Sequence, residues 1–239
     1  MIARLRDSWT REGPGVPKDM PPKTGLALLG ATIRREAWDL FMLNLLVAIS
    51  SLAIITIPAA HAAGARVAQA MLRDQPIYLL RDYMQAFRAL FWRASGLGGA
   101  AALLVGLAGY GVYIYGQLAL HSVIYTGPAI ILLAAALFFA ACALQAVVMM
   151  SDAQDTRGGL LRRAAAITLA SPLHMPAAMA TVAALWLAHL MFYPVSVFLP
   201  AVANFSLGVL LVTFAALSAK AHATSRATGR PASATQETR

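Results

Sequence analysis

Three polar side chains could do chemistry inside otherwise apolar runs of this sequence: Asn44, His61 and Arg66. Polar and ionisable groups within a membrane usually face a helix bundle or a water-filled cavity, where they find partners. These three side chains could therefore lie along a substrate path. The alternative is structural, with Arg66 extending its long side chain to the membrane surface and making ordinary hydrogen bonds there.

The residue patterns that identify enzymes are missing. There is no phosphate-binding glycine loop, no His/Glu spacing for zinc, and no serine nucleophile with supporting His and Asp. The single cysteine, Cys142, lies within an apolar run and provides neither a disulfide framework nor a thiolate metal site. We therefore expect a protein that is not an enzyme and that uses no metal and no other cofactor. A membrane-embedded enzyme is the least favoured alternative.

The composition predicts a membrane protein. Hydrophobic residues make up 59% of the 239 positions and charged residues 12%, too few to cover a water-soluble surface. We expect an all-α, polytopic helical bundle surrounded by the lipid bilayer. The formal net charge of +9 would suggest nucleic acid for a soluble protein. Here the arginines cluster between apolar runs, as the positive-inside rule requires, so no nucleic-acid partner is expected.

Several apolar runs are candidates for membrane spans, because about 20 apolar residues cross the hydrocarbon core. They comprise residues 38–57, 59–72, 96–118, 128–150, 172–193 and 200–219. The second run is short and contains His61 and Arg66, so it decides the topology. We favour six transmembrane helices; the alternative is five, with 59–72 failing to cross and the N-terminus outside.

Loop charges favour six spans. Residues 73–93 and 151–170 carry arginines, whereas 119–127 and 194–199 carry no Lys or Arg. Basic loops stay in the cytoplasm, and both tails are basic, so both termini are expected there, in the bacterial inner membrane. The expected organisation is a mobile N-terminal tail, a transmembrane domain and a mobile C-terminal tail. Their boundaries are 1–36, 37–220 and 221–239.

The break between the first two runs is Thr56-Ile57-Pro58. Proline cannot continue a helix, but it suits the first turn of a new one. We therefore expect a hairpin at this point, across which Asn44 could turn toward His61 and Arg66.

A basic amphipathic pattern follows over residues 77–93. Apolar residues recur at helical spacing, while Arg81, Gln85 and Arg88 line an adjacent polar face. We expect one interfacial helix with its arginines toward lipid phosphates or a protein. It is either a plain linker or a docking surface, and the pattern alone does not separate the two. Further along, Gly98, Ala102 and Gly106 could serve internal packing or a homo-oligomer.

The same stretch carries a family resemblance. The motifs Leu43-Asn44-Leu45-Leu46 and Ile54-Ile55-Thr56-Ile57, with Ser51 between them, resemble a signature of the bacterial YesL family. Arg73-Asp74, Tyr78, Arg81-Asp82-Tyr83, Ala86-Phe87-Arg88 and Phe91 resemble its second motif. The resemblance covers about 40–94 and departs at Ala53, where the family commonly has Pro, and at Pro58, where it commonly has Gly. It implies a small polytopic protein associated with carbohydrate use and sugar ABC importers.

The resemblance and the absence of enzyme motifs in the sequence together suggest an accessory subunit of a carbohydrate ABC importer. Its partners would be permease and ATPase subunits, contacted through Arg81, Asp82, Phe87 and Arg88. Asn44, Thr56 and Pro58 would build the hairpin. The alternative function is a small self-contained transporter with Asn44, His61 and Arg66 near its path.

Overall fold

The structure is a computed structural model, and it describes residues 23–152 and 158–228. Within these two ranges the chain forms helices and no β-strand, which confirms the all-α membrane bundle expected from the sequence. The helices are, in order, α2 (Gly25–Arg35), α3 (Ala37–Ser50), η1 (Ile54–Thr56), α4 (Ile57–Leu72), α5 (Leu79–Ala119), η2 (Val123–Tyr125), α6 (Thr126–Ser151), α7 (Leu160–Ala170), α8 (His174–Met191), η3 (Pro200–Asn204) and α9 (Phe205–Thr228).

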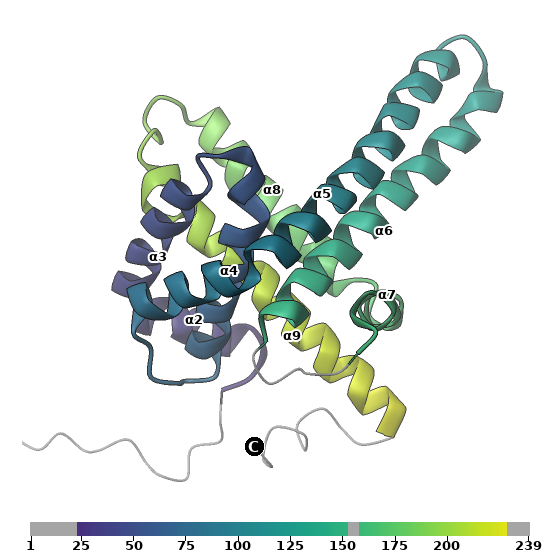
Figure 1. The fold of residues 1–239 in the computed structure, drawn as a ribbon. Helices are drawn as coiled ribbons and strands as arrows, with labels where there is room; N and C mark the ends of the chain where they lie inside the picture. The colour runs from purple at the N-terminus through teal and green to yellow at the C-terminus, as the bar shows by residue number, and fades with distance from the viewer. Residues whose placement is uncertain (1–22, 153–157, 229–239) are drawn as a thin grey trace, which may run out of the picture.

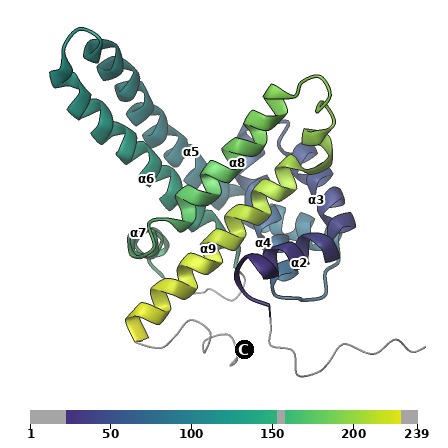
Figure 2. The same cartoon turned by 180° about the vertical axis from the view of Figure 1, so that it is seen from behind.

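Two long hairpins, α5–α6 and α8–α9, diverge from a shared region, with α3 and α4 packed beside it (Figure 1). The rear view shows the same divergence, with α9 running along α8 (Figure 2). Among the described residues, four segments are long and apolar enough to cross a membrane. They are Leu79–Ala119, Val123–Ser151, His174–Met191 and Val202–Arg226.

Helix α4 lies at the centre of the bundle, in contact with α3, α5, α6 and α9. It is rich in alanine, and most of its residues are fully buried, as Ala60, Ala63 and Ala68 illustrate. Small side chains allow several helices to pack closely against one another. The weak hydropathy of this run therefore reflects contact with other helices rather than with lipid.

The predicted hairpin around Pro58 is present, but the first helix is shorter than expected. Helix α3 ends at Ser50 instead of continuing to Ile57, and Pro58 lies in the first turn of α4. With 14 residues, α3 is about 21 Å long, shorter than a hydrocarbon core of about 30 Å. Neither α3 nor α4 is long enough to qualify as a span by length and apolarity.

The basic amphipathic segment is not a separate helix, because α5 continues through it without a break for 41 residues. No proline or glycine interrupts the junction at Ala94 and Ser95. The sequence pattern places Ile77, Leu80, Met84, Phe87 and Phe91 on the apolar face, and all of them except Leu80, which is 63% exposed, pack against the core. The most buried residues of this stretch lie beside them and are Tyr83, Ala86, Leu90 and Ala94.

The tails are shorter than predicted. Residues 25–35 of the expected mobile N-terminal tail form α2, in which Leu29 and Thr32 are buried. Arg35 ties this helix to the bundle, because its Nη2 donates a hydrogen bond to the Met71 carbonyl at 2.8 Å. At the other end, α9 continues beyond residue 220 to Thr228. Predictions for residues 1–22 and 229–239 lie outside the described residues.

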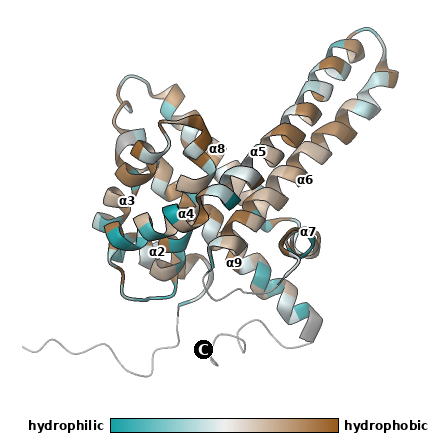
Figure 3. Cartoon of the chain, viewed as in Figure 1, coloured by the Kyte–Doolittle hydropathy of each residue, from teal (hydrophilic) through white to brown (hydrophobic). Residues whose placement is uncertain are grey.

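Among the described residues, charged side chains gather toward one end of the molecule, here called the basic end. The sequence has no Lys, Arg, Asp or Glu in 40–65, 94–151 or 164–219, which include the turns at the opposite end. The most hydrophilic residues gather around α2 and the lower part of α9 (Figure 3). Both ends of the described chain lie at this basic end (Figure 1). The protein is therefore a multi-pass membrane protein.

This arrangement predicts the outcome of single-cysteine labelling in a Cys142→Ala background. Thr24→Cys and Thr224→Cys lie at the basic end and should react with a membrane-impermeant maleimide from the same side. Ser122→Cys, in the exposed turn between α5 and α6, should react only from the opposite side. Labelling of Thr24→Cys and Ser122→Cys from one side would contradict this topology.

Candidate functional site: a polar cluster joining α4, α6 and α9

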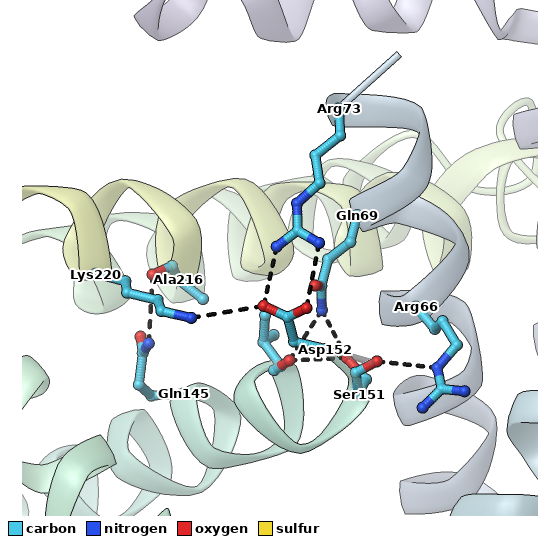
Figure 4. Close-up of polar contacts among 9 residues, drawn as sticks. Arg66, Gln69, Arg73, Gln145, Ser151, Asp152, Ala216 and Lys220 are labelled. Atoms are coloured by element: carbon cyan, nitrogen blue, oxygen red, sulfur yellow. Dashed lines mark hydrogen bonds and ion pairs between the residues drawn. The ribbon is translucent and has the colours of Figure 1, made fainter. Parts of the chain in front are cut away.

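Helix α4 carries a polar stripe toward the end of α6. Arg66, Gln69 and Arg73 are three and four residues apart, so they share one face of the helix. Their side chains extend toward the last turn of α6, where Gln69 is almost completely buried (Figure 4). An otherwise alanine-rich helix therefore presents a row of donors to a single neighbour.

The donors satisfy backbone groups that α6 leaves unpaired. The last four carbonyls of an α-helix have no partner within the helix itself. Gln69 Nε2 donates to the Val148 carbonyl at 2.9 Å and to Ser151 Oγ at 2.8 Å. Arg66 Nε donates to the Ser151 carbonyl at 2.9 Å. The polar stripe of α4 thus caps α6 from outside.

Asp152, directly after α6, is the acidic centre of the cluster. Its side chain is only 4% exposed, and Arg73 binds it with both terminal nitrogens, at 3.2 Å to Oδ1 and 2.9 Å to Oδ2. Lys220 of α9 brings Nζ to 3.5 Å from Oδ2. A buried carboxylate is costly unless it is paired and hydrogen-bonded, and these two cations provide that pairing.

Helix α9 joins the cluster through further hydrogen bonds. The buried Gln145 of α6 donates through Nε2 to the Ala216 carbonyl at 3.3 Å (Figure 4). Ser171, after α7, donates to the Ala219 carbonyl at 3.3 Å. The polar cluster, as named here, consists of Arg66, Gln69, Arg73, Gln145, Ser151, Asp152 and Lys220. It holds α4, α6 and α9 together at the basic end.

The chemistry available to this cluster is binding and support. Its one carboxylate is occupied by two cations, and no nucleophile lies beside a free base. Within residues 23–152 and 158–228, no three His, Cys, Asp or Glu side chains gather in a metal-binding arrangement.

Asn44 forms a second polar anchor, between α3 and the start of α9. It is fully buried, and its Nδ2 donates to the Pro200 carbonyl at 2.8 Å. Its Oδ1 accepts the backbone N–H groups of Phe205 at 2.9 Å and Ser206 at 3.0 Å. Asn44 therefore caps α9 at the point where the π-helix η3 passes into it.

The other intramembrane residues singled out from the sequence have local roles. The Thr56 hydroxyl donates to the carbonyls of Ser50 and Ala53 and so closes the turn between α3 and α4. Pro58 packs so closely against Gly98 of α5 that a side chain at Gly98 would clash with the proline ring.

His61 bonds within its own helix, with Nδ1 2.9 Å from the Ile57 carbonyl. The hydrogen bonds of Asn44 thus go to η3 and α9, that of His61 to α4 and that of Arg66 to α6. These contacts support the structural alternative for all three residues.

The four residues predicted to contact a partner do not share one surface. Arg81 and Arg88 are exposed and line one shallow hollow on α5. Phe87 instead packs on the core, with its ring stacked on Tyr83 at 6.3 Å between centroids. Asp82 Oδ2 accepts the Tyr78 N–H at 2.9 Å, which supports the first turn of α5. Of these four residues, only the two arginines are exposed, and Arg81 also pairs with Asp82 at 3.0 Å.

Sequence reasoning missed Gln69, Gln145 and Ser151 and treated Arg73, Asp152 and Lys220 only as loop or tail charges. A detectable signal was present, because the 66, 69, 73 spacing places three polar residues on one face of a weakly apolar helix. Gln145 inside an apolar run was a second signal.

The cluster predicts an asymmetric response to loss of charge. Asp152→Asn should lower the free energy of unfolding by about 3 kcal/mol, because it removes the buried carboxylate that pairs with Arg73 and Lys220. Denaturant unfolding in mild detergent would measure this. The control is Asp74→Asn, whose side chain is 80% exposed beside Arg35, and it should change stability by less than about 1 kcal/mol. Equal effects of the two substitutions would contradict a stabilising role for the cluster.

Part of this chain is similar to a known protein family. Residues 40–112 match the model of a family described as a protein of unknown function, DUF624. The matched stretch covers less than half of the chain and contains most of α3, all of α4 and most of α5, including Asn44 and the polar stripe. No curated protein and no solved structure matches the chain. The α3–α4–α5 unit is thus the part of this membrane protein that is similar to the DUF624 family.

Proposed function

We propose that this protein is a non-enzymatic accessory subunit that binds other membrane proteins, in a carbohydrate ABC importer of the bacterial inner membrane. The observation that carries the proposal is the outer half of the α5–α6 hairpin. It stands apart from the rest of the bundle (Figure 1), carries no charged residue, and exposes large apolar side chains such as Leu103, Leu107 and Ile131.

The outer half of the hairpin presents a helix face suited to close packing. Toward α6, Ala108 is buried and Gly111 lies against Leu132. On the opposite side, Gly106 and Gly109 have open space where a side chain would be. Of the three small residues noted in the sequence, only Gly98 is used internally, against Pro58. The rest of that surface supports contact with a helix of another membrane protein.

Arg81 and Arg88 would add a polar contact at the basic end. Both lie on the part of α5 that packs along α4, far along the helix from the hairpin tip. In this proposal the basic end faces the cytoplasm, where ATPase subunits are accessible. The carbohydrate assignment rests on the resemblance of 40–94 to the YesL family; the DUF624 match overlaps this stretch and adds no substrate.

Co-purification tests the proposal. The tagged full chain, extracted from native membranes in mild detergent, should isolate permease and ATPase subunits of a sugar importer. The double variant Arg81→Glu/Arg88→Glu should lose ATPase recovery by about tenfold, because it replaces attraction with repulsion. A matched control is Arg34→Glu/Arg162→Glu, which changes the same charge at exposed positions of α2 and α7 and should retain the partners.

A substitution in the α5–α6 hairpin tests the proposed contact with the permease separately. Gly106→Leu should reduce permease recovery, because it adds bulk to the face offered for helix packing. Gly127→Leu, in the exposed first turn of α6, should not. Purification of the chain alone, together with sugar flux when it is the sole protein in liposomes, would contradict the accessory role and favour a self-contained transporter.

A further inference from the structure

Arg66 has hydrogen-bonding capacity that the polar cluster does not use. Only its Nε takes part, through the bond to the Ser151 carbonyl. Its two terminal nitrogens have no partner within the described residues, and they point away from Asp152 (Figure 4). A guanidinium group held by one nitrogen, with its outer fork unoccupied, is suited to bind an oxyanion.

Arg66 also lines a hollow of about 210 Å³ between α4 and the beginning of α5. Gln75 and Gln85 line this hollow, and their side-chain amides make no hydrogen bond within the described residues. Val67 and Ile77 form an apolar part of its wall. Residues with side-chain donors from three separate segments thus line one small hollow that also has an apolar wall.

The local charge favours an anion. Asp82 also lines the hollow, but Oδ2 accepts the Tyr78 N–H at 2.9 Å and Oδ1 binds Arg81 Nε at 3.0 Å. Gln85 lines a second, shallower hollow as well, together with Arg81 and Arg88. Arg66 thus lines the site itself, Arg81 and Arg88 line the adjacent hollow, and the carboxylate of Asp82 already has partners.

We propose that this hollow is a phosphate-binding site, in which Arg66 binds two phosphate oxygens and the amides of Gln75 and Gln85 bind the third. This inference does not depend on the proposed importer function. The phosphate could belong to the headgroup of an anionic phospholipid at the basic end or to a small soluble phosphate ester. The chemistry of recognition is the same for both, and the two sources can be separated by experiment.

Binding is tested with the full chain in mild detergent at constant ionic strength. One arm titrates inorganic phosphate, and the other adds mixed micelles containing phosphatidylglycerol, with phosphatidylcholine micelles as reference. Isothermal titration calorimetry and the melting temperature report binding. Saturable binding of phosphatidylglycerol above the reference indicates a lipid headgroup, whereas saturable binding of phosphate alone indicates a soluble ligand. Absence of saturable binding in both arms would overturn the proposal.

Gln85→Glu is the decisive variant, because it puts a carboxylate into the hollow and leaves the Arg66–Ser151 bond intact. It should weaken binding of the effective probe by about tenfold or more, as expected for a charge-assisted site. Gln117→Glu, exposed near the far end of the same helix, should bind as the wild type does. Undiminished binding by Gln85→Glu would assign the affinity to another surface and refute this site.

Discussion

The end of α6 imposes the constraint on which the rest of the structure depends. Its last carbonyls and the carboxylate of Asp152 lie away from water, where unpaired polar groups are costly. Their partners come from two other helices, through the polar stripe of α4 and through Lys220 of α9. The polar groups at the end of α6 are therefore paired by α4 and α9. This pairing fixes the position of three helices that are distant in the sequence.

This constraint explains the unusual composition of α4. The helix must approach α3, α5, α6 and α9, which favours alanine and glycine, and it must also carry donors on one face. Gly64 illustrates the closeness, because a side chain there would press against Val47 and Val209. A helix that meets these requirements cannot also be long and strongly apolar. Asn44 repeats the principle nearer the opposite end, where it caps α9 from α3.

The molecule has two kinds of surface. The bundle around α4 is tied by buried polar contacts, whereas the outer α5–α6 hairpin has no such contact and shows its apolar sides and glycines outward. The two proposals made above use these two kinds of surface. In the first, the hairpin packs against a helix of another membrane protein, and in the second, the hollow beside Arg66 binds a phosphate.

Local and compositional features were predictable from the sequence alone. Long uncharged stretches require membrane-spanning helices, and Pro58 marks a helix start because proline lacks the N–H that a helix interior needs. The helix that each polar side chain contacts was not predictable. The spacing of Arg66, Gln69 and Arg73 defines one face of α4, but it does not identify the helix that packs against that face. Tertiary structure alone decided that Asn44 serves α9, that α5 stays continuous past residue 93, and that Asp152 is buried. Each outcome depends on contacts between segments far apart in the chain, and rules for local structure do not predict such contacts.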